Sequence, residues 1–352
     1  MTAQKGRKTN LQLLEECDSF PYDQIPQLIS GEAGYYAFLL PGDDRPHGYI
    51  APSVVEQMPW TSDFVVDDPP QQQQQQQPRR VMLLDTSQGT DTAAACNASF
   101  RTLLQAAQDK GVFSKTLGRK AEGEDFRIMA ARNYQGKRAL VQLRRSAAPL
   151  FGIANRGAHM TVYTKSEEGK YRFWVPRRSR YCRTYPGMLD NTVAGGVKAE
   201  ESPLECIIHE ADEEASLPED FVTKHVKPVG IITYVTQTGS GGGSDKQAEA
   251  GGYDVGLCVP DVLYNYDLEV PPELAEAIVP KPRDDEVEEF YLWDLETVQE
   301  AMAQGEFKPN TAVALIDFFI RHGIVNEENE PAFVDIVSRL HRKLHVPTSR
   351  EW

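Results

Sequence analysis

The stretch of the chain that most restricts its possible folds runs from Gly195 to Leu217, with the sequence GGVKAEESPLECIIHEADEEASL. It opens with two glycines, which favour a tight turn. Ser202 and Pro203 then mark a helix start, because serine caps a helix well and proline suits its first position. An apolar stripe follows at helical spacing. The stripe consists of Leu204, Ile207, Ile208, Ala211 and Ala215. We therefore predict a turn followed by an amphipathic helix that packs on a core.

Three carboxylates share another face of this predicted helix. Glu210, Glu213 and Glu214 lie at positions i, i+3 and i+4. A solvated acidic face is the ordinary alternative. It is disfavoured because like charges repel at these spacings, and because anions in the last turn oppose the helix dipole at roughly 0.3–1 kcal/mol each. A divalent cation with oxygen ligands makes the same cluster favourable, so we predict a metal site.

The segment resembles the Nudix box, G-x5-E-x7-R-E-U-x-E-E-x-G-U, in which U is an apolar residue. The matching positions are Gly195, Glu201, Glu210, Ala211, Glu213, Glu214 and Leu217. Two positions depart from the pattern, since His209 replaces the arginine and Ser216 replaces the second glycine. The arginine orients a carboxylate in the family, and histidine offers one hydrogen bond instead of a fork. Ser216 either accepts backbone strain at the helix exit, or the exit differs. We expect these departures to affect the rate more than the reaction.

Segments on both sides of the box resemble one Nudix subfamily, the thiamin-diphosphate-related group of fungi and plants, which includes the Nudix half of fungal thiamin pyrophosphokinases. The similar segments are Tyr185 to Gly196, Phe307 to Asn310, and Ile316 to Gly323. The similarity is clear from about Phe151 onward and thin before Leu140. No kinase domain follows residue 352, so we predict no kinase.

The resemblance implies roles for individual residues. It implies that Glu213 and Glu214 are ligands of Mg²⁺ or Mn²⁺, and that Glu210 is a further ligand or the general base. Glu201 supports the site, and the carbonyl of Ala194 or Gly195 completes it. The metal would neutralise diphosphate oxygens and lower the pKa of bound water.

Two further groups are candidates for the site. A later loop often supplies another acid in this superfamily, and Glu286 is the candidate here, although a solvated acidic loop fits its neighbourhood equally well. Arginines form a basic cluster before the box and match phosphate oxygens in bidentate fashion. They are Arg177, Arg178, Arg180 and Arg183. We expect only one or two of them to bind substrate. His159 is expected to be a packed residue rather than a base.

Composition limits the partners. A formal net charge of −15 argues against nucleic acid. No run of about 18 apolar residues occurs, so no membrane span is predicted. The five cysteines are scattered without a C-x-x-C pair, and the N-terminus has no signal-like apolar region, which together favour a reducing, cytoplasmic location. The expected partner is a small-molecule diphosphate, and the oligomeric state stays open.

The length of 352 residues favours two domains. We expect an α/β accessory domain over residues 1–147, with a disordered glutamine tract near 69–78, and a Nudix domain over 148–352, with a flexible Gly/Ser insertion near 239–252. The expected fold class is α/β (α+β), a Nudix α/β/α sandwich preceded by the smaller domain.

The expected activity is Mg²⁺-dependent hydrolysis of a diphosphate to a monophosphate plus phosphate. The subfamily resemblance implies thiamin diphosphate-like substrates, in oxidised or damaged forms. One alternative is a Nudix pyrophosphatase for another nucleoside diphosphate derivative such as ADP-ribose. The other is a non-catalytic binding module, suggested by His209 and Ser216 and opposed by the intact Glu210, Glu213 and Glu214.

Overall fold

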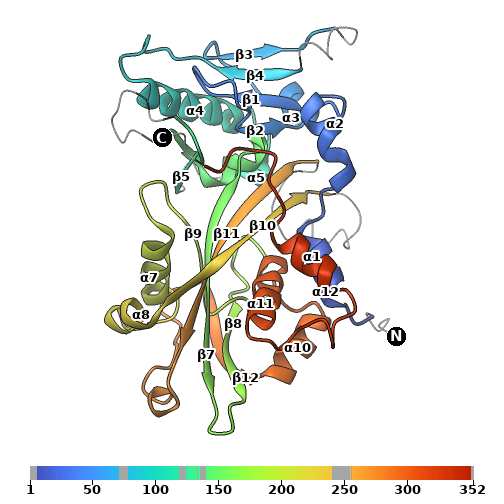
Figure 1. Ribbon diagram of the computed structural model, residues 1–352. Coiled ribbons are helices and arrows are strands. Elements are labelled where there is room, and N and C mark those ends of the chain that lie inside the picture. The colour runs from blue at the N-terminus through green and yellow to red at the C-terminus, as the bar shows by residue number, and fades with distance from the viewer. Residues whose placement is uncertain are drawn as a thin grey trace.

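The computed structural model describes residues 6–70, 78–118, 124–132, 134, 140–239, 254 and 256–349 (Figure 1). The glutamines at 71–77 and the insertion at 240–252 lie outside the described residues, so the predictions about them stay predictions. The described part combines helices with three sheets, which confirms the mixed α/β (α+β) fold class.

The largest sheet has six strands in the order β10-β11-β7-β8-β12, with β9 paired to β7. Strand β11 runs parallel to β7, and the other pairs are antiparallel. Strand β9 pairs along the first half of β7, where Ala194 faces His159. The prediction of a turn at the two glycines is wrong, because Gly195 and Gly196 pair with Ala158 and Gly157 inside the strand, and the chain turns only at residues 199–200. The strands are β7 (Asn155–Lys165), β8 (Tyr171–Arg178), β9 (Val193–Gly196), β10 (Lys227–Gln237), β11 (Cys258–Glu269) and β12 (Val287–Asp294).

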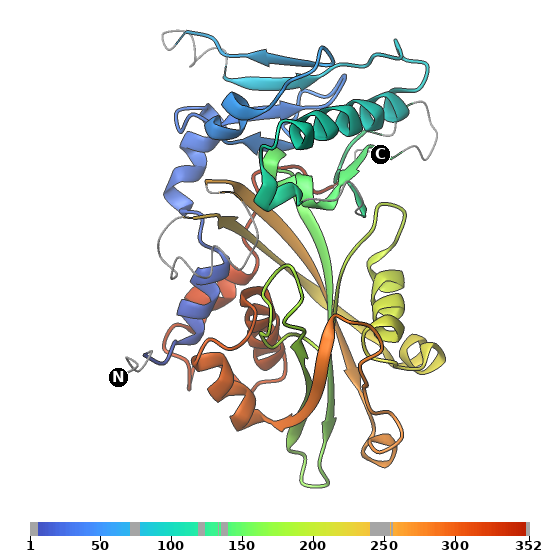
Figure 2. The same cartoon turned by 180° about the vertical axis from the view of Figure 1, so that it is seen from behind.

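Helices cover both faces of this sheet (Figures 1 and 2). Side chains alternate between the faces along each strand, so each face buries its own apolar cluster. One cluster joins Ala158 of β7 to Ile207 of α7 (Pro203–Glu213) and Val222 of α8 (Glu219–His225). The other joins Tyr163 of β7 to Phe318 of α11 (Pro309–Arg321). Helices α10 (Leu295–Ala303) and α12 (Phe333–Leu340) extend this second cluster. The result is an α/β/α layering.

The first half of the chain builds a four-stranded sheet in the order β2-β1-β4-β3. Helix α4 packs its apolar side toward the core of this half and begins at the N-cap Asp91. The elements are α2 (Ile25–Ser30), β1 (Tyr36–Leu39), β2 (Gly48–Ile50), α3 (Pro52–Gln57), β3 (Phe64–Asp67), β4 (Arg80–Leu83), α4 (Thr92–Asp109), α5 (Ser114–Leu117), β5 (Asp125–Arg127), β6 (Gln142–Arg144) and α6 (Ala148–Phe151).

The two halves are joined by contacts in both directions. The core of the first half includes Val235 of β10 and Val259 of β11. In return, α1 (Asn10–Cys17) buries Leu14 in the second-half cluster beneath α11 and α12. Arg342, just after α12, donates to a carboxylate oxygen of Asp18 at 2.7 Å. The boundary at residue 147 stays a prediction, and packing crosses it.

Two observations bear on the environment of the chain. Within the described ranges, no helix has both the length and the apolar character needed to cross a bilayer. All five cysteines are free, and four of them are buried.

Candidate active site

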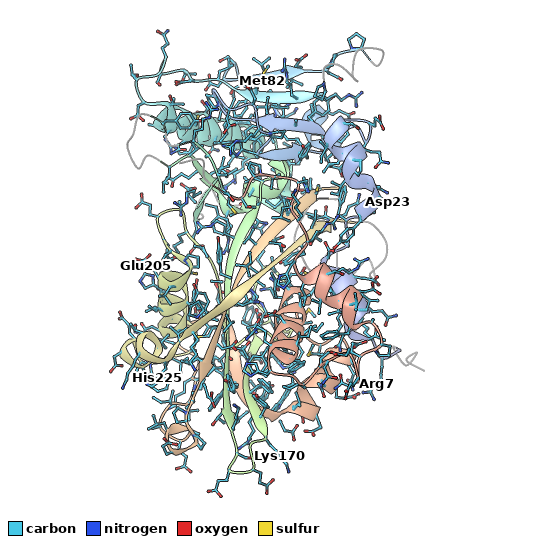
Figure 3. The ribbon with its side chains drawn as sticks, viewed as in Figure 1. Arg7, Asp23, Met82, Lys170, Glu205 and His225 are labelled. Carbon is cyan, nitrogen blue, oxygen red and sulfur yellow. The ribbon has the colours of Figure 1, made fainter. Side chains whose placement is uncertain are left out.

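Helix α7 begins and ends as its sequence dictates. The Ser202 hydroxyl accepts a hydrogen bond from the Glu205 amide, and the Glu205 carboxylate accepts one from the Ser202 amide, which completes a capping box. Pro203 occupies the first turn. Glu205 and His225 lie on the outer side of α7 and α8 (Figure 3). At the other end Ser216 adopts a left-handed conformation with φ +53°, which is the strained exit expected for a residue in a glycine position.

The carboxylates of α7 meet the glycine-containing strand β9. The Ala194 amide donates to Oε2 of Glu214 over 3.2 Å. A Cβ atom placed on Gly195 would lie closer to Oε1 of Glu210 than real Cβ atoms essentially ever come to another atom. Gly195 is therefore required so that the Glu210 side chain can lie against the strand. The carbonyl groups of Ala194 and Gly195 belong to the same strand.

Burial and mutual repulsion disfavour the charged forms of the carboxylates in this cluster. Glu214 is only 6% exposed, and burial followed by the nearby charge of Glu210 raises its pKa well above the usual range. Burial, Glu124 and Glu213 raise the pKa of Glu210 to about 7, in that order of effect. Glu213 itself is exposed at the rim. A cation held by these oxygens would relieve the repulsion.

The donor set suits a hard divalent cation because it consists of carboxylate oxygens beside backbone carbonyls. The carboxylates do not converge on a single point. Among the residues that the structure describes, no group of three or more His, Cys, Asp or Glu side chains stands in metal-binding geometry. The carboxylates would therefore have to close around a cation by rotation of their side chains.

A cleft of about 2020 Å³ opens beside these residues. Eight of the residues predicted for the site line it: Ala194, Gly195, Glu210, Glu213, Glu214, Glu286, Arg178 and Arg183. The other three, Glu201, Arg177 and Arg180, are not among its lining residues.

Glu201 acts on the helix rather than on the cleft. Its Oε1 atom lies 2.6 Å from Nδ1 of His209, and its Oε2 atom accepts a 3.4 Å hydrogen bond from the Lys198 amide. Glu201 thus connects the turn before α7 to the helix itself. The contact between His209 and Glu201 is the single hydrogen bond that a histidine can offer where the box has an arginine.

The four arginines differ in what they contact. Arg178 is largely buried and pairs with Asp190 at 2.9 Å. Arg183 donates to the backbone carbonyls of Lys115 and Thr116, which ties the loop after β8 to the first half of the chain.

Arg177 and Arg180 point elsewhere. Arg177 donates to the Gly187 carbonyl at 2.9 Å. The Arg180 side chain is 81% exposed and 3.8 Å from Glu288. Substrate contact by these arginines stays a prediction, and Arg178 and Arg183 are the two that reach the cleft.

Glu286 occupies the loop just before β12 and is exposed at the cleft edge. The Ser179 amide donates to its backbone carbonyl at 2.8 Å, which holds the loop next to the end of β8. Its charge contributes to the raised pKa of Glu210 and of Glu214. Glu286 therefore shares the cleft with the α7 carboxylates.

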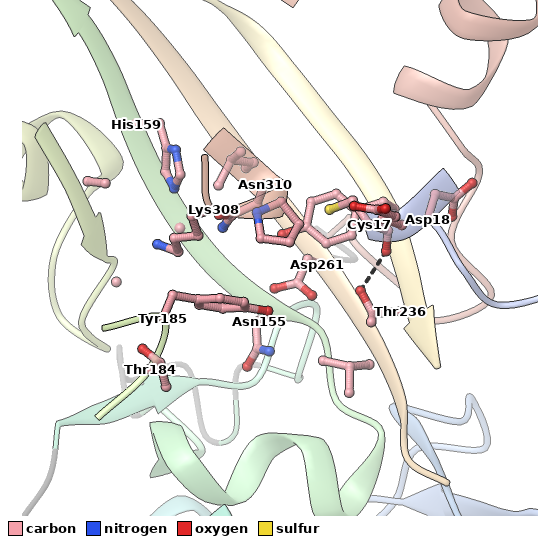
Figure 4. A pocket seen from close by; sticks show the side chains of 18 of the residues that line it. Cys17, Asp18, Asn155, His159, Thr184, Tyr185, Thr236, Asp261, Lys308 and Asn310 are labelled. Carbon is pink, nitrogen blue, oxygen red and sulfur yellow. Dashed lines mark hydrogen bonds between the residues drawn. The ribbon is translucent and has the colours of Figure 1, made fainter. Parts of the chain in front are cut away.

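Sequence reasoning did not assign several residues that line the same cleft. Glu124, from the first half of the chain, pairs with Lys198 at 3.3 Å and so reaches the box. The cleft is also lined by Asn155, Tyr185, Asp261 and Lys308 (Figure 4). Lys308 stands in the segment Phe307 to Asn310 that carried the subfamily resemblance, which was the one signal available for it. His159 is 4% exposed and its Nδ1 atom lies 2.6 Å from Oδ1 of Asn191, while burial lowers its pKa to about 4. It is packed, as expected, although it also contributes to the cleft wall.

Comparison with known proteins gives sequence relatives for part of the chain. No family model matches. The chain is 38% identical over 213 residues to the uncharacterized protein YJR142W of Saccharomyces cerevisiae, covering 60% of each chain. It is 34% identical over 202 residues to the Arabidopsis thaliana protein Nudix hydrolase 20, chloroplastic, covering 57% of this chain and 48% of that protein. The chain thus spans about half to three fifths of the length of these relatives.

A solved structure from Deinococcus radiodurans, DR0079, is similar to 52% of this chain and to 91% of its own, with 17% identity and a TM-score of 0.34. A likeness at this level has no bearing on function. The sequence relatives carry more weight, since the aligned regions include more than half of this chain. Together with the box on α7, the similarity to named Nudix hydrolases supports the Nudix hydrolase family for this chain.

Proposed function

We propose that this protein is a Mg²⁺-dependent hydrolase that cleaves a diphosphate to a monophosphate plus phosphate. The observation that carries the proposal is that Glu210, Glu213 and Glu214 all line one cleft, with Glu214 buried against the Ala194 amide. A helix that served stability alone would place cations at this end rather than three carboxylates. The assignment of a catalytic role to these residues is part of the proposal.

The residues of the box would have different roles in this reaction. Glu213 and Glu214, with a carbonyl of Ala194 or Gly195, would hold Mg²⁺ or Mn²⁺, and Glu210 would be a further ligand or the general base. A bound divalent cation supplies neutralisation of the diphosphate oxygens and a lowered pKa for the attacking water. Glu201 keeps the turn and the helix in register through Lys198 and His209. Glu286 would add a further carboxylate from the opposite rim.

Cationic side chains in the cleft support an anionic substrate. Arg178 and Lys308 both line the cleft, and both pair with Asp190, at 2.9 and 3.3 Å. Guanidinium and ammonium groups beside the metal carboxylates suit the oxygens of a diphosphate.

For the substrate we propose a thiamin diphosphate-like compound, in an oxidised or otherwise altered form. The support is the resemblance of Tyr185 to Gly196 and Phe307 to Asn310 to the thiamin-related Nudix group. In the structure both segments flank the cleft, since Tyr185 and Lys308 line it. We further propose a cytoplasmic location, which rests on the sequence alone.

The test is a product screen with the purified full chain and Mg²⁺. The panel contains thiamin diphosphate, its oxidised derivatives, ADP-ribose and simple nucleoside diphosphates, and the products are separated by chromatography. We expect a monophosphate plus phosphate from the thiamin-type compounds and no turnover in excess EDTA. Cleavage of ADP-ribose to AMP and ribose phosphate, without thiamin-type turnover, would transfer the assignment to that substrate. Turnover that persists in EDTA would overturn the metal mechanism.

A further inference from the structure

A row of polar side chains crosses the sheet and lines the cleft. None of these side chains is among those proposed to hold the metal. Tyr234 of β10 is the register partner of Asp261 of β11, and Asp261 is the register partner of Asn155 of β7. Partners directly opposite one another project to the same face of a sheet. Here that face carries α11, whose first turn brings in Asn310. All four residues line the cleft.

The amide groups in this row have fixed orientations. The Asn155 amide donates to the Asp261 carboxylate, and the Asn310 amide donates to the Tyr234 hydroxyl. The Oδ1 atoms of both asparagines are buried and have no hydrogen-bond partner among the described residues. Asn155 as a whole is only 9% exposed. A buried acceptor without a donor destabilises the folded protein, so two such atoms in one wall call for another group that donates to them.

Asp261 adds further acceptor capacity between these oxygens. Burial raises its pKa to about 7, although Asn155 and Lys308 act in the opposite direction. Lys308 does not neutralise it fully, because the ammonium lies 3.3 Å from Asp190. The wall therefore offers acceptors in excess of donors, with a carboxyl group at its centre.

We propose that Asn155, Asp261 and Asn310 form a recognition subsite for the organic group of the substrate, which must be a nitrogen heterocycle that donates N–H hydrogen bonds. The proposal rests on the proposed function, since it places this group beside the diphosphate chemistry. A ring with N–H donors would satisfy the two orphaned amide oxygens and the carboxyl group together. A hydrocarbon ring would leave these acceptors without donors, which is unfavourable for buried groups. The subsite therefore selects rings with N–H groups over hydrocarbon rings.

Tyr185 supplies an aromatic surface at the same end of the cleft (Figure 4). It is half-buried and its backbone is held in the left-handed region with φ +49°. Such a conformation is costly for a tyrosine and is retained where the surroundings fix a side chain in position. Stacking of a planar heterocycle on this ring is the geometry that we assign to the bound substrate.

Binding of the organic group can be measured without hydrolysis. Thiamin and adenosine, which carry N–H donors but no diphosphate, are titrated into the full chain in EDTA by calorimetry, with 2-phenylethanol as a ring without N–H groups. We expect thiamin or adenosine to bind and 2-phenylethanol not to. Binding of thiamin alone would assign a thiamin-type heterocycle to the substrate, and binding of adenosine alone would assign a nucleoside-type heterocycle.

Two substitutions test the subsite directly. Asp261→Asn and Asn155→Leu should each weaken binding of the heterocycle by about tenfold or more. Asp335→Asn, on the exposed side of α12, is the matched control and should leave binding unchanged. Melting temperatures of all variants identify any that fail to fold, and Asn310→Leu replaces a variant lost in this way.

The outcomes separate this inference from the hydrolase assignment. Absence of binding by both heterocycles, equal binding of 2-phenylethanol, or unchanged affinity in the folded variants would overturn the subsite. Variant-sensitive binding together with no turnover of any diphosphate would support the subsite while the hydrolase proposal fails. Turnover of a diphosphate, with no effect of these substitutions on the binding of the ring, would support the hydrolase proposal while the subsite fails.

Discussion

The Nδ1 atom of His209 lies 2.6 Å from Oε1 of Glu201, so the histidine in the arginine position of the box keeps one contact with the box glutamate. The histidine is largely exposed, with 60% of its side chain accessible, whereas the Glu201 side chain is 11% exposed. The exposed His209 side chain therefore fixes the orientation of the largely buried Glu201 carboxylate. An arginine at this position would offer two parallel donors to the same carboxylate.

We predict that His209→Arg leaves kcat unchanged or raises it. The guanidinium can form the fork that the imidazole cannot, and no other side-chain hydrogen bond of His209 is given up among the described residues. His209→Ala should instead lower kcat, because Glu201 loses its partner. Steady-state kinetics with saturating Mg²⁺, beside far-UV circular dichroism, measure both. A loss of several hundred-fold in a folded His209→Arg protein would show that histidine has a role of its own.

The second departure from the box predicts a change in stability. Ser216 has φ +53°, where a residue with a Cβ is strained and glycine is not. Ser216→Gly should therefore raise the free energy of unfolding by about 1 kcal/mol. The same change at Ser338, an exposed position within α12, should lower it by about 0.5–1 kcal/mol. Urea unfolding of both variants tests this, and equal effects of the same sign would contradict it.

Local features of the sequence were enough to predict the elements that position the candidate site. The cap at Ser202, Pro203 and the apolar stripe define α7, which the structure places at Pro203–Glu213. Helix α4, Thr92–Asp109, likewise has its N-cap, Asp91, and its apolar spacing within one short segment.

Contacts between distant segments were beyond this kind of prediction. Asp261 meets Asn155 only because β11 lies parallel to β7, and a parallel pairing of strands so far apart leaves no local signal. Arg178 was predicted as a phosphate ligand because of its charge, and its pairing with Asp190 follows from the return of the chain after β8. Helix α1 packs on α11 and α12, which lie at the other end of the sequence. These relationships depend on topology rather than on composition.

The contact between Asp18 and Arg342 predicts a large loss of stability. Arg342 is 4% exposed and donates to Asp18 at 2.7 Å and to the Phe20 carbonyl at 2.6 Å. Arg342→Ala leaves the buried Asp18 without its main cation, which typically costs about 3–5 kcal/mol. Arg7→Ala removes a surface pair with Glu300, whose side chains are 71% and 41% exposed, and should cost less than about 1 kcal/mol. Thermal and urea unfolding compare the two, and a similar small effect for both would contradict the prediction.

A substitution at Glu214 shows whether this residue is a metal ligand or an acid with only a structural role. Glutamine keeps the size of the side chain and an oxygen that can accept the Ala194 amide, but it removes the charge. If Glu214 holds the cation, Glu214→Gln should lower kcat/KM by at least about 10²-fold, comparable to the loss of a transition-state contact of roughly 2.7–4 kcal/mol.

The same substitution should not lower stability in EDTA at pH 7. The folded-state pKa of Glu214 is raised by burial and by Glu210, so its charged form is disfavoured in the native state above the pKa of the unfolded chain, and glutamine removes that cost. Glu167→Gln, an exposed change in the turn between β7 and β8, is the matched control and should alter neither quantity. The comparison requires kcat/KM with saturating Mg²⁺ and the melting temperature in EDTA. Near-wild-type turnover in a folded Glu214→Gln protein would remove this residue from the metal site.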